Sequence, residues 1–226
     1  MENKTVLLLN SSMFISQDYF KKRNISIQWG SQRVEQYILG LSSLKTNNVF
    51  NSFDSTIFTD NTIKNLSKVP YKIKQLLPEN TIYSLSKNNK SGKKNKGAGL
   101  VENLKNCSDL ISKFDYIFYF EPRLIIQDPE ILVSFSEEPK KVFFSQSEQP
   151  GLYRTGHFGT DVKSLNNFLK TQDINKIIEE KITIEYEFYK FFNKYNPIEH
   201  NHSISRRNTG YRYKLKIDDE DAYENY

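Results

Sequence analysis

Five segments that are expected to form short strands are spaced through the first 145 residues, and helical segments alternate with them. The strand segments are TVLLL (5–9), STIFT (55–59), TIYSL (81–85), YIFYF (116–120) and KVFFS (141–145). TVLLL is apolar without polar alternation, which is typical of a strand that is covered on both faces. Strands that alternate with helices predict an α/β fold, with a Rossmann-like, mostly parallel sheet and helices on both faces.

Helices are predicted between these segments and after the last of them. SQRVEQYILGLSSL (31–44) repeats apolar residues at i, i+3, i+4, i+7 and i+10, with Ser31 as the expected N-cap and Arg33 in the first turn, off the apolar stripe. A second helix is interrupted before Pro70, because the residue before a proline disfavours helical backbone. Three further helices are predicted, at GLVENLKNCSDLISKF (99–114), VKSLNNFLK (162–170) and IEYEFYKFFNKY (184–195), and ISIQW (25–29) is a candidate short strand.

Length and charge favour one domain with an anionic ligand. The chain has 226 residues, 37% of them hydrophobic, so we expect one domain over residues 1–216. IDDEDAYENY (217–226) carries five acids and no base, and it is expected to form an acidic tail. Since the whole chain carries +5, residues 1–216 carry +10. That charge suits a nucleotide, a phosphorylated lipid surface or nucleic acid.

The few cysteines and histidines limit the chemistry. One cysteine excludes an internal disulfide, and one cysteine with three histidines cannot form a tetrahedral zinc cluster without carboxylates. His200 and His202 are a weak metal signal, with a solvated polar loop as the alternative. The N-terminal apolar run is too short for a signal peptide or a membrane span. We therefore expect a cytoplasmic protein, and contact at the inner face of a membrane is left open.

Polar residues follow the predicted strands where ligands bind in parallel sheets. Because such ligands lie beyond the carboxyl ends of the strands, the sequence nominates Asn10, Asp60, the loop 86–99 and the triplet Glu121-Pro122-Arg123. In the triplet, Glu121 is suited to bind a metal or a sugar hydroxyl, and the planar guanidinium of Arg123 is suited to bind a diphosphate. The alternative is a proline-kinked strand end whose charges pair with neighbours.

The loop SKNNKSGKKNKGAG (86–99) has the elements of a phosphate site. Lys96 supplies a positive charge, and Gly97 and Gly99 would let the backbone approach a ligand at the start of a helix. The loop matches neither the P-loop nor the dinucleotide-binding pattern. A solvated, flexible loop is the alternative.

Two candidate site residues, Glu185 and His157, lie in the C-terminal third of the chain. Glu185 and Glu187 are two residues apart, so they diverge on a helix and one of them at most is expected to face a cleft. We favour Glu185, near the helix start, because the helix dipole stabilises its ionised form. His157 lies between Gly156 and Gly159 and is a candidate substrate contact, although a lone histidine is usually structural.

The order of the motifs along the chain is itself informative. RVEQY opens a helix, FTDN ends a strand, KGAG opens a second helix, DYIFYFEPR is an aromatic strand with a polar end, and a TGHFGT loop and an IE-x-E helix follow. Over roughly residues 5–192 this order resembles the bacterial GT-A-type sugar-nucleotide glycosyltransferases that build lipopolysaccharide and capsule. The resemblance implies a GT-A-like domain that moves a hexosyl group from a nucleotide-diphosphate donor to a hydroxyl on a glycan or lipid-linked acceptor.

The resemblance also implies roles for particular residues. Donor binding would involve Asn10, Arg33, Asp60, Lys96, Gly97, Gly99, Glu121 and Arg123; acceptor binding would involve His157 and Glu185; and catalysis would involve Arg123 and Glu185. In that family the position of the triplet usually carries Asp-x-Asp, which holds a divalent metal such as Mn²⁺ or Mg²⁺. Here Glu121 stands at the first Asp and Arg123 at the second, and a cation there would repel a metal and neutralise the diphosphate itself. No metal ligand is therefore predicted.

Two other functions remain open. A nucleic-acid-binding protein would use the +10 charge, the lysine-rich loop and the many aromatics. The aromatics fall inside strands and on core stripes, however, so no nucleic-acid partner is expected. A catalytically degenerate transferase that acts as a scaffold is the third possibility, with the missing Asp-x-Asp as its mark.

Overall fold

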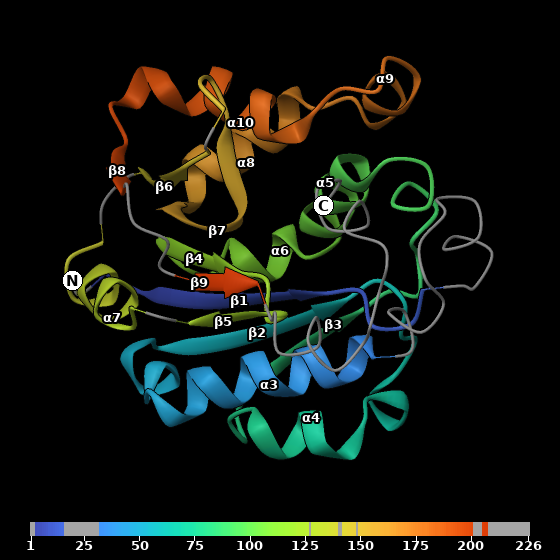
Figure 1. The fold of residues 1–226 in the computed structure, drawn as a ribbon, viewed down its shortest axis with the longest axis vertical. Helices are drawn as coiled ribbons and strands as arrows, with labels where there is room; N and C mark the ends of the chain where they lie inside the picture. Colours follow the sequence, from blue (N-terminus) through green and yellow to red (C-terminus); the bar gives the residue numbers. More distant parts are fainter. Residues whose placement is uncertain are drawn as a thin grey trace, which may run out of the picture.

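The computed structural model describes residues 3–15, 32–126, 128–139, 142–147, 149–200 and 205–207. Within them, seven strands form one sheet in the order β3-β2-β1-β4-β7-β6-β8 (Figure 1). Their bounds are β1 Thr5–Ser11, β2 Ser55–Asp60, β3 Ile82–Leu85, β4 Tyr116–Phe120, β6 Val142–Gln146, β7 Tyr153–Asp161 and β8 Ile198–His200. Strands β1 to β4 are mutually parallel, and β7 runs antiparallel between β4 and β6. The predicted α/β fold with a mostly parallel sheet is confirmed.

Helices cover both faces of this sheet (Figure 1). Three of them pack on one face: α3 (Arg33–Thr46), α4 (Tyr71–Leu76) and α7 (Glu130–Glu137). Five pack on the other: α5 (Lys96–Asn106), α6 (Ser108–Ile111), α8 (Val162–Thr171), α9 (Ile174–Glu179) and α10 (Ile184–Phe192). Short 3₁₀ turns occur at Val49–Ser52, Leu66–Lys68 and Asn193–Tyr195. None of the described helices is long and apolar enough to cross a membrane.

The central strands are apolar on both sides because a core lies on each. Along β1, Val6 and Leu8 belong to one core, Leu7 and Leu9 belong to the other, and none of the four is exposed. Side chains of adjacent strand residues point to opposite faces. An unbroken apolar run in the sequence therefore becomes a strand buried from both sides.

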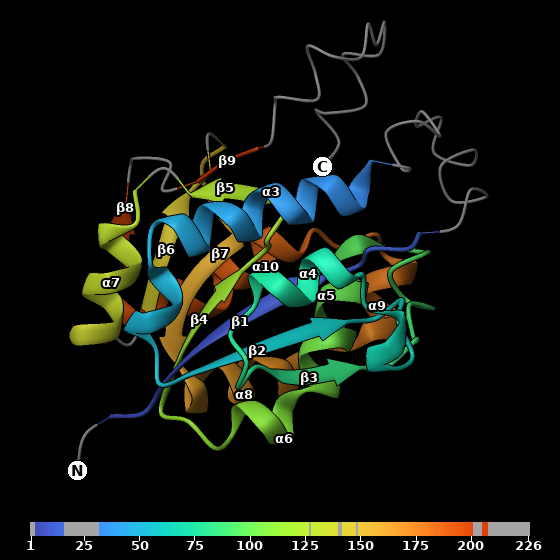
Figure 2. The same cartoon turned by 90° about the horizontal axis from the view of Figure 1, so that it is seen from below.

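A second, smaller sheet extends the carboxyl edge. Strand β5 (Leu124–Ile126) follows β4 after a turn and pairs antiparallel with β9 (Ser205–Arg207), which returns from far along the chain. Figure 2 shows α3 lying beside β5 and β9. This layer rests on the same helix that carries Arg33.

The prediction of a loop at TGHFGT is wrong. Residues 155–160 lie inside β7, with hydrogen-bonded strands on both sides. At position 159 a Cβ would stand only 2.4 Å from the ring of Phe135, so a residue larger than glycine would overlap with that ring. Glycine thus marks close packing at this position, where the sequence suggested a turn.

Other boundaries also differ. The predicted helix 99–114 begins earlier, at Lys96, and is divided at Cys107 into α5 and α6. Helices α7 and α9 were not predicted. The expected cap Ser31, the candidate strand 25–29 and the acidic tail 217–226 lie outside the described residues, as does His202.

Candidate active site at the carboxyl edge of the sheet

The triplet Glu121-Pro122-Arg123 is a tight turn at the carboxyl end of β4. The N–H of Leu124 donates to the carbonyl of Glu121 at 2.9 Å, which closes a four-residue turn with proline in its second position. The N–H of Glu121 donates to the carbonyl of Gly156 at 2.8 Å and ties the turn to β7. The two interpretations of the triplet are therefore compatible, because the chain turns and also presents its charges at the rim.

Helix α3 presses directly on this turn. A Cβ at Gly40 would stand only 1.9 Å from the carbonyl oxygen of Pro122, so the helix can approach this closely only with glycine there. Ser43 Oγ, one turn further along, accepts the N–H of Ile126 at 3.1 Å. The glycine and the serine together fix the turn and β5 against the helix.

Glu121 and Arg123 form an ion pair at the rim. Arg123 donates its Nε to Glu121 Oε1 at 2.7 Å, and its Nη2 donates to the same oxygen. The side chains are 26% and 17% exposed, respectively. Burial acts to raise the pKa of Glu121, but the nearby charges of Arg123, Arg33 and Lys96 outweigh it and hold this pKa below its usual value. Glu121 is therefore ionised, with three cations around it.

Arg33 reaches this cluster from the first residue of α3. Its Nε donates to the carbonyl of Ser12, just beyond β1, and its guanidinium lies 5.9 Å from the ring centre of Tyr37. The prediction that Arg33 lies off the apolar stripe is wrong. It is buried on the face that carries Tyr37 and Gly40, four and seven residues later.

Lys96 joins the cluster, and the neighbouring glycines pack against other parts of the protein. Lys96 is exposed at the start of α5 and close enough to lower the pKa of Glu121. A Cβ at Gly97 would stand 2.6 Å from Ile184 Cβ, and a Cβ at Gly99 would stand 2.5 Å from the Cα of Gly92. At both positions glycine therefore makes room for other protein atoms, and backbone contact with a ligand stays a prediction.

The lysine-rich loop is held in place from inside. Glu102 of α5 accepts the backbone N–H of Ser91 at 3.3 Å and its hydroxyl at 2.9 Å. The loop lysines Lys87, Lys90 and Lys93 are exposed. The alternative of a solvated loop describes these side chains well, but the loop backbone is braced.

Asn10 lies in a chain of buried polar side chains. Its Nδ2 donates to Tyr119 Oη at 2.7 Å, and its Oδ1 accepts from Asn103 Nδ2. Asn103, in the middle of α5, also accepts from Thr59 Oγ1 at 3.0 Å. The sequence reasoning missed Asn103, although an amide among the apolar residues of α5 was a usable signal. Asn10 thus links the end of β1 to β4 and to α5.

Asp60 has no exposed surface. Its carboxylate accepts from Ser11 Oγ at 2.6 Å, from the N–H of Met13 at 3.0 Å and from the N–H of Thr62 at 2.6 Å. Both oxygens are used to hold the loops after β1 and β2. In this arrangement Asp60 acts on a ligand only through the loops that it fixes, so direct contact with a nucleotide stays a prediction.

His157, in strand β7, is buried, and Glu185, in helix α10, is partly buried. His157 is 2% exposed and its Nε2 is 2.6 Å from Ser145 Oγ. Burial, with the charge of Arg154, lowers the pKa of His157 to about 3, so the ring is neutral. The structure gives His157 a core position, which contradicts direct contact with an acceptor. Glu185 accepts from Thr155 Oγ1 at 3.0 Å, in the first turn of α10.

The structure therefore brings four of the predicted residues together: Arg33, Lys96, Glu121 and Arg123. Asn10 and Asp60 support the loops beneath them. Within the described part of the chain, no three His, Cys, Asp or Glu side chains gather as a metal cluster. A single carboxylate that is bonded to an arginine, with two further cations nearby, does not fit a divalent metal ion. The cluster carries three positive charges and one negative charge, which suits an anion.

Comparison with known proteins identifies the fold. No protein-family model matches the sequence, and no curated protein resembles it at the sequence level. One similar solved structure is a protein assigned as a nucleotide-diphospho-sugar transferase from Desulfovibrio desulfuricans G20, with 8% identity, 96% of this chain and 90% of that chain covered, and a TM-score of 0.55. A second is 4-diphosphocytidyl-2C-methyl-D-erythritol synthase from Anaerococcus prevotii, with 9% identity, 92% and 94% covered, and a TM-score of 0.53.

A third is a protein assigned as a glucose-1-phosphate thymidylyltransferase from Bacillus anthracis, with 11% identity, 90% and 87% covered, and a TM-score of 0.50. Each comparison spans nearly the whole of both chains. At such low identity they establish shared architecture: the chain has the α/β fold of these three proteins.

Proposed function

We propose that the chain is a glycosyltransferase that moves a sugar from a nucleotide-diphosphate donor to a hydroxyl of a glycan or lipid-linked acceptor in surface polysaccharide synthesis. The observation that carries the proposal is the cationic cluster of Arg33, Lys96 and Arg123 around Glu121. It lies at the carboxyl edge of the parallel strands, where ligands of open α/β sheets bind. The names of the proteins that share the fold support a nucleotide-linked substrate.

The proposed reaction breaks the bond between the sugar C1 and the diphosphate oxygen and forms a bond from C1 to the acceptor oxygen. Negative charge develops on the departing diphosphate, and Arg123 and Lys96 stabilise it there. The acceptor proton passes to a base, for which Glu185 is the candidate. No step depends on a metal ion, because the residues at the triplet do not fit one.

Nucleotidyl transfer is the second candidate, because one of the proteins with this fold is named as a thymidylyltransferase. The two reactions release different products from the same donor. Glycosyl transfer releases a nucleoside diphosphate when an acceptor is present. A nucleotidyltransferase that is given pyrophosphate and a nucleotide sugar releases a nucleoside triphosphate and a sugar phosphate.

The test begins with a thermal-shift panel of UDP-, GDP-, dTDP- and CMP-sugars, each with and without Mn²⁺, followed by product analysis. A specific donor at 100 times its Kd raises the free energy of unfolding by about 2.7 kcal/mol. We expect Arg123→Ala to lower turnover by about 100-fold or more. Lys96→Ala should also weaken turnover, whereas the matched loop variant Lys93→Ala should match the wild type.

Each alternative function predicts a different experimental result. If no nucleotide sugar stabilises the protein, the proposal is wrong. If donors bind but Arg123→Ala changes nothing, the scaffold interpretation is favoured. Strong oligonucleotide binding that weakens steeply with salt, without donor turnover, would favour the nucleic-acid interpretation.

A further inference from the structure

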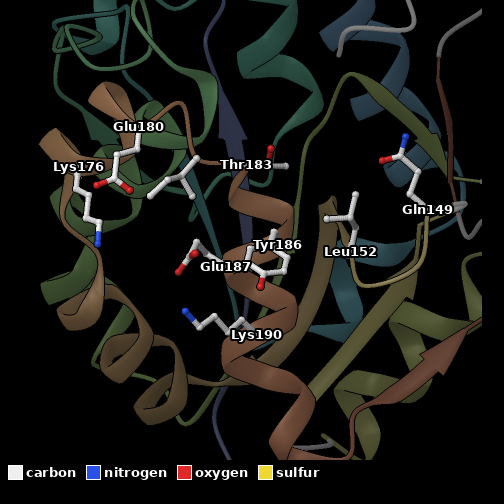
Figure 3. Close-up of a pocket in the computed structure, with 9 residues that line it drawn as sticks. Gln149, Leu152, Lys176, Glu180, Thr183, Tyr186, Glu187 and Lys190 are labelled. Atoms are coloured by element: carbon white, nitrogen blue, oxygen red, sulfur yellow. The ribbon is translucent and has the colours of Figure 1, made fainter.

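A groove with a volume of about 600 Å³ runs along the outer face of α10 (Figure 3). One wall comes from α9 and the segment that follows it, with Lys176 and Glu180. The other wall comes from the connection between β6 and β7, with Gln149. In Figure 3, the side chains of α10 lie between these two walls. None of these residues belongs to the cationic cluster.

The charges of the groove cancel. Lys176 and Lys190 contribute two positive charges, and Glu180 and Glu187 contribute two negative charges. Within the described residues, none of the four takes part in an ion pair with N···O of 4.0 Å or less. Their donors and acceptors are therefore directed to solvent or to a ligand. The groove offers many hydrogen bonds and no net charge.

An exposed aromatic ring completes the lining. Tyr186 is 48% exposed and stands on α10 one turn before Lys190. An exposed tyrosine presents an apolar ring face and a polar hydroxyl at its tip. A flat apolar surface beside many hydrogen-bonding groups matches a pyranose, which has C–H groups on one face and hydroxyls around its edge.

One end of the groove is near the start of α5. Thr183, at the N-terminus of α10, lines the groove. The next residue, Ile184, is the one that a Cβ at Gly97 would meet, and Lys96 of the cationic cluster precedes that glycine. The end of the groove at Thr183 is therefore near the start of α5, which carries Lys96.

We infer that this groove binds a neutral saccharide, as the glycan portion of the acceptor. The identification as acceptor rests on the proposed function, but the binding of a neutral saccharide does not. A lipid chain would bury the charged side chains of the groove away from water, which is costly, and a polyanion would need an excess of positive charge. The groove suits neither ligand, because four of its nine lining side chains are charged and their charges balance.

The test measures saccharide binding separately from donor binding. The full-length chain is applied to an array of neutral glucose-, galactose- and N-acetylglucosamine-based oligosaccharides, with sulfated and sialylated ones alongside. The neutral glycan that binds best is then titrated by calorimetry. Tyr186→Ala should weaken its affinity by about tenfold or more. The matched control is Tyr71→Ala, which removes a 70% exposed tyrosine from α4 on the opposite face of the sheet and should leave the affinity unchanged.

A second variant guards against misfolding. Glu187→Gln keeps the shape of the side chain, so it should fold normally and weaken glycan binding while its circular dichroism spectrum stays that of the wild type. The stabilisation by nucleotide sugars should be equal in the wild type and all three variants. That equality shows that the cationic cluster is intact.

The outcomes separate the two proposals. If nucleotide sugars stabilise the protein but no neutral glycan binds, the inference about the groove is wrong and the proposed function stands. Binding of acidic glycans alone, or neutral binding that Tyr186→Ala and Glu187→Gln both leave intact, also overturns it. If neutral glycans bind in the groove but no nucleotide sugar does, saccharide binding stands and the proposed function fails.

Discussion

Three cationic side chains lie near Glu121, and one of them, Arg123, forms hydrogen bonds with it. Arg123 holds it directly, and Arg33 and Lys96 lie close enough to keep its pKa low. Binding of an anion stabilises a cluster with an excess of positive charge, because the anion offsets the repulsion between the like charges. A diphosphate can therefore compete with Glu121 for Arg123. Until an anion binds, the hydrogen bond to Glu121 holds the guanidinium of Arg123 in one orientation.

His157 should make the stability of the protein depend on pH. Its pKa is lowered from 6.5 to about 3, first by burial and then by Arg154. Between these values the unfolded chain binds a proton that the folded chain does not, so the free energy of unfolding rises with pH. The slope from this one group is at most about 1.4 kcal/mol per pH unit. Urea unfolding of the wild type and His157→Gln at pH 7, 6 and 5 measures it.

The comparison isolates the histidine, because the other titrating groups are common to both proteins. We expect the wild type to lose more stability than the variant as the pH falls from 7 to 5. Parallel pH profiles for the two proteins would mean that the ring is not held neutral in the folded state.

Among the elements, α3 does most to shape the candidate site. It contributes Arg33 to the cluster, its Tyr37 hydroxyl accepts the N–H of Ser12 at 2.9 Å, and its Gly40 lies against the turn at Pro122. One helix thus sets the loop after β1 relative to the turn after β4. Its position depends on a glycine that has no ligand-binding function of its own.

We predict that Gly40→Ala destabilises the protein. In an exposed helix this change stabilises by about 1 kcal/mol, but here the added Cβ would overlap a backbone carbonyl that cannot move alone. Overpacking of this kind lowers the free energy of unfolding by about 1–3 kcal/mol. The displaced helix should also weaken the thermal shift from a nucleotide sugar. Ser42→Ala, two residues away on α3, is the control for both measurements.

A Gly40→Ala variant that is more stable than the wild type would contradict the close contact. A variant that is less stable but binds donor normally would show that α3 supports the fold and does not set the geometry of the cluster.

The elements differ in how well the sequence predicts them. Strands β1 and β4 were predicted because each is apolar on both faces, which leaves an unbroken run. Strand β7 was missed because Gly156 and Gly159 imitate a turn, and Phe135, the reason for the second glycine, lies on a helix that was not predicted. A local pattern does not show that a distant ring will occupy the space above a glycine.

The same limit applies to the site. The strand-end rule selected Glu121, Arg123 and Lys96, because it depends only on where a strand stops. It also selected Asp60, whose carboxylate is bonded to Ser11, 49 residues away. Whether a polar side chain meets a ligand or another part of the protein depends on partners that the local sequence does not identify.

At the scale of the whole molecule, one sheet separates two cores. The core under α3 and the core under α5, α8 and α10 share β1, β2 and β4, whose alternate residues enter one or the other. A strand cannot keep its pairing if either core is lost, since its hydrogen bonds and both sets of side chains move together. The two cores should therefore unfold as one unit, as the prediction of a single domain over residues 1–216 requires.

Substitutions on opposite faces test this coupling. Leu41→Ala on α3 and Leu165→Ala on α8 each remove a side chain with no exposed surface, and each should lower the free energy of unfolding by about 2–5 kcal/mol. In both variants, far-UV and near-UV circular dichroism should give the same single transition, because loss of either core releases the shared strands. If Leu41→Ala instead produces a first transition that leaves the α8 side folded, the sheet does not couple its faces. The cationic cluster, which draws Arg33 from one face and Lys96 from the other, would then be disrupted before the protein unfolds completely.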